Sequence, residues 1–218
     1  MFQMLGRLTT FAVIIALTTS ANADESRRAL VLSSDFGTTE RFVASMKGVA
    51  LGVDPNLQVH DLTHHIEPFN IWQASYMLAG TIEYWPEGTV FVSVVDPGVG
   101  TERKSVVAKT GTGHFVVTPD NGSLTLVADK QGILEIRQID ETINRRPGSE
   151  SSHTFHGRDV YSYTGARLAA AVIRFENVGP LLEPKIERLR YQRPKKLDDG
   201  GVAGTITHIE MPFGNVVT

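Results

Sequence analysis

The feature that most constrains the fold is an apolar run ended by a rigid turn, Phe91-Val92-Ser93-Val94-Val95-Asp96-Pro97-Gly98. A run rich in β-branched and aromatic residues predicts a strand covered on both faces, as in a parallel sheet. Proline fixes φ and glycine permits a tight turn, so the strand ends there and leaves Asp96 at its carboxyl end. Ligands of open α/β sheets bind at that end, which makes Asp96 and nearby Arg103 candidates for function. A turn-capping aspartate beside a surface arginine is the alternative.

The rest of the chain predicts an α/β fold with three layers and a mostly parallel central sheet flanked by helices. Strands are expected at 29–34, 57–62 and 89–95, alternating with helices at about 42–50 and 69–84. Shorter strands follow at 105–109, 114–118 and 133–139. Beyond them we expect a polar loop at 141–152, an Ala-rich helix at 160–175, a linker or surface wrap at 180–196, and strands at 204–210 and from 216.

Composition excludes several classes of protein. The chain has 218 residues, a net charge of -3 and no cysteine, which suits one well-buried α/β domain without disulfides. Lysines and arginines form no stripe, so the sequence predicts neither nucleic-acid nor membrane-surface binding. Small-molecule ligands remain as the expected partners.

The N-terminus predicts a secretory signal peptide at 1–23. Met1 to Arg7 carries one positive charge, Leu8 to Ser20 is an apolar-to-small run, and Ala21-Asn22-Ala23 has the pattern of a signal-peptidase site. The apolar run is shorter than the roughly 20 residues that span a bilayer. We therefore expect a periplasmic or secreted protein; an uncleaved anchor or a misassigned start codon is the alternative.

Polar residues that follow the predicted strands allow two chemistries, and both stay open at this point. A metal-dependent hydrolase would draw its ligands from imidazoles and carboxylates, here Asp35, Asp61, His64, His65 and His156. A metal-free site would use Asp96, kept ionised by Arg103, together with a histidine to orient a water and accept its proton. No serine or cysteine sits in a nucleophile elbow, which disfavours acyl-enzyme chemistry.

Asp35 directly follows the first predicted strand. A carboxylate there, with Gly37 permitting close backbone approach, is well placed to accept two hydrogen bonds from a ribose diol. The strand is not followed by Gly-x-Gly-x-x-Gly, so a dinucleotide is not expected. The alternative role for Asp35 is a helix N-cap.

Five motifs in order resemble the S-adenosyl-L-methionine (SAM) hydroxide adenosyltransferases, relatives of the fluorinating and chlorinating enzymes. The resemblance runs from about Ala29 to Thr218 and rests on Ser34-Asp35-Phe36-Gly37-Thr38-Thr39, Asp96-Pro97-Gly98-Val99-Gly100, Pro119-Asp120-Asn121-Gly122, Phe155-His156-Gly157-Arg158-Asp159 and Pro212-Phe213-Gly214-Asn215. It implies attack of a water-derived hydroxide on C5′ of SAM, giving adenosine and L-methionine without a cofactor or metal.

The resemblance also implies roles for individual residues. Asp96, Arg103 and His156 match the water-activating triad, and Asp96 favours hydroxide over halide as the nucleophile. Glu210 stands where the family usually has aspartate, which keeps the charge and adds a methylene. The implied substrate-binding residues are Asp35 for the ribose diol, Phe69 beside the sugar, Glu210 and Asn215 at the methionine end, and Phe213 in the same segment.

The same resemblance implies a C-terminal β-barrel domain after the Pro-Phe-Gly-Asn segment, and a homotrimer whose sites lie between subunits. We assign 24–196 to the α/β domain and 197–218 to its final strand and the start of the truncated second domain. The barrel supplies the adenine contacts in the family, so we expect the 218-residue form to bind SAM weakly and turn over slowly. A non-catalytic nucleoside-binding or vestigial domain is the alternative function.

Overall fold

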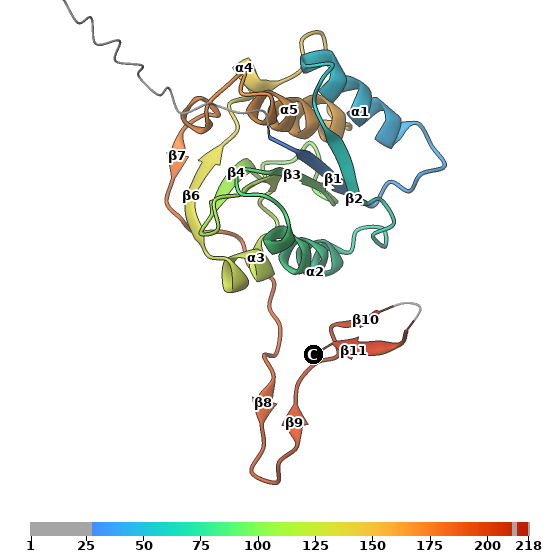
Figure 1. Cartoon of the computed structure of the whole chain (residues 1–218), viewed down its shortest axis with the longest axis vertical. Coiled ribbons are helices and arrows are strands. Elements are labelled where there is room, and N and C mark those ends of the chain that lie inside the picture. The colour runs from blue at the N-terminus through green and yellow to red at the C-terminus, as the bar shows by residue number, and fades with distance from the viewer. Residues whose placement is uncertain (1–27, 211–212, 218) are drawn as a thin grey trace, which may run out of the picture.

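A computed structural model describes residues 28–210 and 213–217. The predicted signal peptide at 1–23 lies outside the described residues. Figure 1 shows a central twisted sheet with helices on both faces, and an arm that projects from it toward the C-terminus. This arrangement confirms the predicted α/β fold.

The central sheet has seven strands in the order β2-β1-β3-β5-β4-β6-β7. β2, β1, β3 and β5 run parallel, whereas β4 pairs antiparallel with both β5 and β6, and β7 pairs antiparallel with β6. The carboxyl ends of the parallel strands therefore meet at one edge. The strands are β1 (Leu30–Ser34), β2 (Val59–Thr63), β3 (Val90–Val94), β4 (Ser105–Thr110), β5 (Phe115–Pro119), β6 (Ile133–Gln138) and β7 (Leu181–Leu182).

Helices cover both faces of the sheet, as Figure 1 shows. One layer contains α1 (Phe42–Val53), the π-helix η2 (Gly157–Ser162) and α5 (Tyr163–Ala169), which continues it. The other contains α2 (Ile71–Thr81), extended by the 3-10 turn η1 (Ile82–Tyr84), and α3 (Thr125–Lys130). The short α4 (Glu141–Asn144) and η3 (Phe175–Asn177) lie in the connections after β6 and α5.

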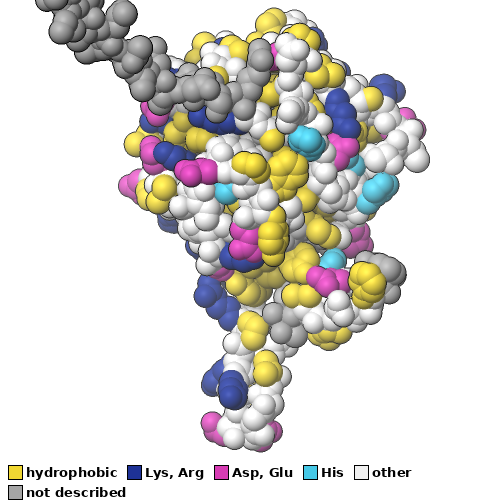
Figure 2. Space-filling view, in the orientation of Figure 1, with side chains coloured by type: hydrophobic (Ala, Val, Ile, Leu, Met, Phe, Trp, Pro, Cys, Tyr) yellow, Lys and Arg dark blue, Asp and Glu magenta, His cyan; other side chains and the backbone are white. Residues whose placement is uncertain are grey.

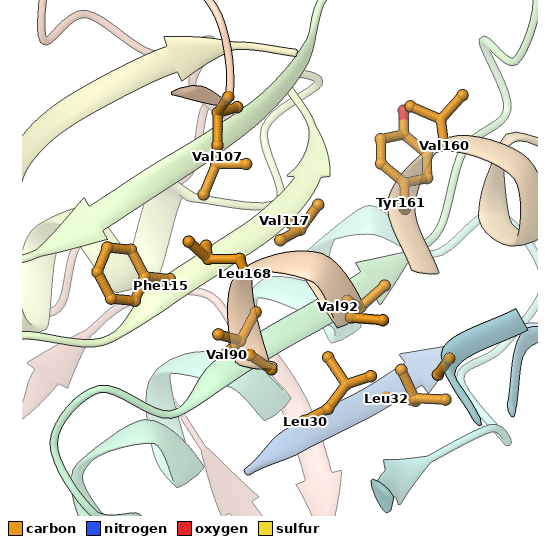
Figure 3. Close-up of a cluster of buried hydrophobic side chains, with 14 of the residues drawn as sticks. Leu30, Leu32, Val90, Val92, Val107, Phe115, Val117, Val160, Tyr161 and Leu168 are labelled. Atoms are coloured by element: carbon orange, nitrogen blue, oxygen red, sulfur yellow. The ribbon is translucent and has the colours of Figure 1, made fainter. Parts of the chain in front are cut away.

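Alternating side chains of the central strands fill two separate cores. Leu30 and Leu32 of β1 pack with Val90 and Val92 of β3 beneath α1 and α5, whereas Val31 packs on the opposite face with α2 and α3 (Figure 3). Because both faces of β1 and β3 are buried, their apolar residues are continuous rather than alternating with polar ones.

Gly165 sets how closely α5 approaches the sheet. A Cβ placed at this position would lie 2.4 Å from Cγ2 of Val92 on β3, closer than carbon atoms pack. The absence of a side chain therefore allows the helix backbone to lie directly on the strand.

Several predicted elements differ in extent. The helix expected at 160–175 is a π-helix from Gly157 followed by α5, which ends at Ala169. α3 replaces a segment for which no helix was predicted, and α4 lies inside the expected loop at 141–152. The strand expected at 204–210 is confined to its last three residues.

The C-terminal arm consists of two small hairpins, formed by β8 (Lys195–Lys196) with β9 (Val202–Ala203) and by β10 (His208–Glu210) with β11 (Asn215–Val217). Charged side chains gather at the end of the first hairpin in Figure 2, where Asp198 and Asp199 follow the two lysines. Within the described part of the chain, no helix is both long and apolar enough to cross a bilayer.

Candidate active site

Asp96 and Arg103 form a two-bonded ion pair at the carboxyl end of β3. Arg103 Nε donates to Asp96 Oδ1 at 2.8 Å, and Nη2 donates to Oδ2. The Asp96 side chain is 5% exposed and that of Arg103 is 11% exposed, so the pair is nearly removed from solvent. The alternative of a surface arginine is therefore wrong. The pair is a rigid planar unit whose charge-assisted bonds fix both side chains.

His156 lies between two guanidinium groups. Its Nδ1 is 3.0 Å from Arg103 Nη2, and its Nε2 is 3.3 Å from Arg145 Nη2. Burial lowers the pKa of His156, the negative charge of Glu141 raises it, and the two arginines lower it; the net pKa is below the ordinary value. Neutral imidazole is therefore the favoured form at neutral pH.

Tyr161 and Ser105 support the ion pair from within the protein. The Tyr161 hydroxyl donates to Asp96 Oδ2 at 3.2 Å, and Ser105 Oγ accepts from Arg103 Nη1 at 2.9 Å. Ser105 also donates to the Tyr161 oxygen at 3.2 Å. Burial, and then the negative charge of Asp96, raise the pKa of Tyr161 far above its usual value, so it remains a hydrogen-bond donor.

The segment that carries His156 is held by Asp159, three residues later in the π-helix. Asp159 is fully buried and accepts hydrogen bonds from Arg158 Nε and Nη2, both at 2.7 Å, and from Arg146 Nε at 3.1 Å. π-Helical turns are rare and frequently occur at functional sites. Here the π-helix begins directly after His156 and contains the buried Asp159.

We expect the ionisation of Asp159 to make the free energy of unfolding depend on pH in the acid range. Burial raises its pKa, but hydrogen bonds from Arg158, Ser152 and Arg146 outweigh that and lower the net pKa. Its contribution should therefore be fully present above the ordinary aspartate pKa and be lost as pH falls through the lower folded value. Urea unfolding between pH 7 and pH 3 should show a smaller loss of stability for Asp159→Asn than for the wild type.

The control is Asp198→Asn on the exposed hairpin of the arm, which should retain the wild-type pH dependence. Equal pH dependence in Asp159→Asn and the wild type would show that protonation of Asp159 does not contribute to acid unfolding.

Asp35 and Phe69, both predicted to bind substrate, are in direct contact. The Phe69 backbone N–H donates to Asp35 Oδ2 at 2.9 Å. Phe69 has a φ of 66°, unusual for a bulky residue, and the residue is 69% exposed. The N-cap alternative for Asp35 is wrong, because α1 begins at Phe42 after Arg41. The two residues form an open polar and aromatic corner beside the carboxyl end of β1.

Glu210, Phe213 and Asn215 lie on the β10–β11 hairpin, and Glu210 contacts Tyr76 of α2. Asn215 Nδ2 donates to Glu210 Oε2 at 3.0 Å, and the Tyr76 hydroxyl donates to Oε1 at 2.8 Å. These hydrogen bonds lower the pKa of Glu210, which therefore stays ionised. Phe213 is 82% exposed at the hairpin turn. Among the described residues, Glu210 bonds to Tyr76 of α2 and to Asn215, and none of its hydrogen bonds reaches the Asp96 cluster.

The residues proposed as metal ligands divide between separate clusters. Asp61 and His64 hydrogen-bond to each other, Asp35 contacts Phe69, and His156 faces the two arginines. Across residues 28–210 and 213–217, no three acidic, histidine or cysteine side chains are grouped so that they could hold a metal ion. This arrangement gives the metal alternative no geometric support.

Two charged members of the site were not predicted from the sequence. Arg145 and Glu141 form an ion pair across one turn of α4, and Arg145 reaches His156. Both lie in the polar segment expected to be a mobile loop. The glutamate and arginine four residues apart are the sequence signal that could have indicated a helical turn there.

Comparisons with known proteins identify a family model and relatives that this chain resembles. Residues 30–179 match the model of the SAM hydroxide adenosyltransferase N-terminal domain. The chain is 39% identical over 193 residues to a protein named (R)-S-adenosyl-L-methionine hydrolase from Methanocaldococcus jannaschii, covering 87% of this chain and 65% of that protein. It is 28% identical over 211 residues to a fluorinase from an Actinoplanes species, covering 87% and 70%.

A solved structure of an uncharacterized conserved protein from Thermotoga maritima superposes with a TM-score of 0.79 at 36% identity, covering 86% of this chain and 69% of that one. The chain thus spans about two thirds of the length of the relatives it matches.

Proposed function

Because this chain belongs to the SAM hydroxide adenosyltransferase family, we propose that it hydrolyses SAM to adenosine and L-methionine. The observation that carries the proposal is the joint position of Asp96, Arg103 and His156, in which Arg103 contacts both of the others. These residues come from two distant segments of the chain and lie together near the carboxyl end of β3. We assign the activation of the attacking water to these three residues.

Asp96 is the group with capacity left to accept a proton from the water. An ionised carboxylate has about four acceptor positions, of which Arg103 takes two and Tyr161 takes one. His156 is less available, because a neutral imidazole has one acceptor nitrogen and both of its nitrogens face guanidinium donors. His156 therefore acts mainly by orienting Arg103.

The reaction balances without a cofactor. The water oxygen forms a bond to C5′ while its proton passes to Asp96, and the C5′–S bond breaks with both electrons going to sulfur. The neutral thioether of methionine leaves, and the proton is later released to solvent. Hydroxide and sulfonium neutralise each other, so a site with little solvent favours this step.

Asp35 supplies the orientation that in-line attack requires. Its carboxylate accepts hydrogen bonds from the two hydroxyls of the ribose diol. The exposed Phe69 packs beside the sugar. Holding the two reactants in line can contribute several kcal/mol, roughly 7–11 in favourable cases. Glu210 and Asn215 are proposed to hold the methionine end.

Incubation with SAM in oxygen-18 water tests the proposal. We expect equimolar adenosine and L-methionine, with the label in the 5′-hydroxyl of adenosine, because attack at C5′ places the water oxygen there. Added chelator should leave the rate unchanged. Label-free adenosine would exclude attack by water at C5′, retention of intact SAM would support a binding protein, and loss of activity with chelator would support the metal alternative.

A further inference from the structure

A chain of four polar side chains runs from the surface to the start of the Asp35 loop. Lys47 Nζ of α1 bonds Asp61 Oδ2 at 2.6 Å, Asp61 Oδ1 contacts His64 Nε2 at 3.0 Å, and His64 Nδ1 contacts Ser34 Oγ at 2.7 Å. Resting on the function proposed above, we propose that this chain positions Asp35 for the ribose diol, which makes Ser34 and His64 positioning residues of the reaction.

The hydrogen bonds of the chain converge on the Asp61 carboxylate from both ends. The Phe36 backbone N–H donates to Ser34 Oγ at 3.3 Å, and the Ser34 hydroxyl then donates to His64 Nδ1. His64 carries its proton on Nε2 and donates it to Asp61, whose other oxygen accepts from Lys47. Every donor along the path has one acceptor, so the imidazole is held in a single tautomer and orientation.

His64 also holds the loop through its backbone. The His64 carbonyl accepts from the Gly37 N–H at 2.7 Å, at a residue whose φ of 65° favours glycine. The side chain of His64 thus fixes Ser34 on one side of Asp35, and its carbonyl fixes Gly37 on the other. Together with the Phe69 N–H on Oδ2, this leaves Asp35 Oδ1 without a hydrogen-bond partner among the residues described here.

The order serine, histidine, aspartate is also that of a hydrolytic triad, but the burial contradicts that role. Ser34 is 0% exposed and His64 is 2% exposed, so no substrate reaches the hydroxyl. The Ser34 oxygen also accepts a hydrogen bond from the Phe36 N–H, which ties it to the loop. The group therefore stabilises a loop conformation rather than attacking a substrate.

The test measures binding of adenosine and of 2′,3′-dideoxyadenosine, which lacks the diol, by titration calorimetry. We expect wild-type protein to prefer adenosine and Ser34→Ala to lose about fivefold in adenosine affinity, the effect of one hydrogen bond. Binding of dideoxyadenosine should not change. With SAM as substrate, kcat/KM should fall about fivefold, in step with the loss of adenosine affinity.

Ser93→Ala is the matched control. Ser93 is a buried serine on the neighbouring strand β3, and its Oγ has no hydrogen-bond partner among the described residues. It should bind both nucleosides like the wild type. If Ser34→Ala unfolds, Lys47→Met changes the half-exposed end of the same chain and should reduce adenosine affinity alone, by about twofold.

Equal loss for both nucleosides, no loss for either, or no wild-type preference for the diol would overturn the positioning role. A collapse of kcat with unchanged adenosine binding would also overturn it, because Ser34 would then take part in the chemistry. Diol-dependent loss in a protein that does not hydrolyse SAM would support the positioning role and contradict only the proposed function.

Discussion

Asp96→Asn should keep the fold and lower the rate of SAM hydrolysis about a thousandfold. The amide has nearly the volume of the carboxylate and can still accept from Arg103, but it cannot take the proton of the attacking water. Loss of a general base typically reduces the rate between about a hundredfold and ten thousandfold. Initial rates of adenosine formation measure the effect, and adenosine affinity should stay close to that of the wild type.

Asp129→Asn is the matched control for this variant. Asp129 on α3 is also bonded by arginines and a tyrosine hydroxyl, namely Arg188, Arg193 and Tyr191, but it belongs to the opposite layer. Its replacement should leave hydrolysis unchanged. Near wild-type hydrolysis in Asp96→Asn would show that another group accepts the proton, with His156 the next candidate.

Arg103→Met should reduce both hydrolysis and stability. It leaves the Asp96 carboxylate, 5% exposed, with Tyr161 as its remaining side-chain donor in the cluster. Removing one partner of a buried ion pair typically costs about 3–5 kcal/mol, because the other charge stays buried and unpaired. Urea denaturation at pH 7 measures the free energy of unfolding, and the rate of adenosine formation measures the loss of activity.

The double variant Asp96→Asn/Arg103→Met separates charge burial from packing. Without the carboxylate no charge is stranded, so the double variant should be more stable than Arg103→Met alone and still inactive. Arg145→Met is the second comparison: its partner Glu141 is 35% exposed and remains hydrated, so the loss should be nearer 1 kcal/mol. Equal stability of Arg103→Met and the wild type would contradict the assigned importance of the ion pair.

The sheet could be predicted from sequence because its central strands are buried on both faces. β3 coincides with the continuous apolar run that ends before Asp96-Pro97-Gly98. α3 could not be predicted in the same way, because six residues with a threonine and an aspartate have little helical signal. Its stability comes from tertiary contacts, including the Leu126 N–H bonded to Ser75 Oγ and Gln131 Nε2 bonded to the Ala79 carbonyl.

Part of the site was predictable for a similar reason. Asp96 and Arg103 lie within one loop, so local sequence was sufficient to associate them. Their association with His156 followed only from the family resemblance, because loop convergence has no local signature. Arg145 reaches His156 from a polar segment without periodicity, where one arginine looks like any other. The π-helix also escaped prediction, since its apolar residues fit an α-helical pattern equally well.

The close contact at Gly165, a residue that takes no part in the reaction, affects where His156 lies. α5 and the π-helix are one continuous rod, and the missing side chain at Gly165 lets that rod rest on Val92. A methyl group at Gly165 would push α5 away from β3 and, because α5 continues the π-helix, would also displace His156 at the start of that helix. The position of His156 thus depends on the absence of a side chain at Gly165.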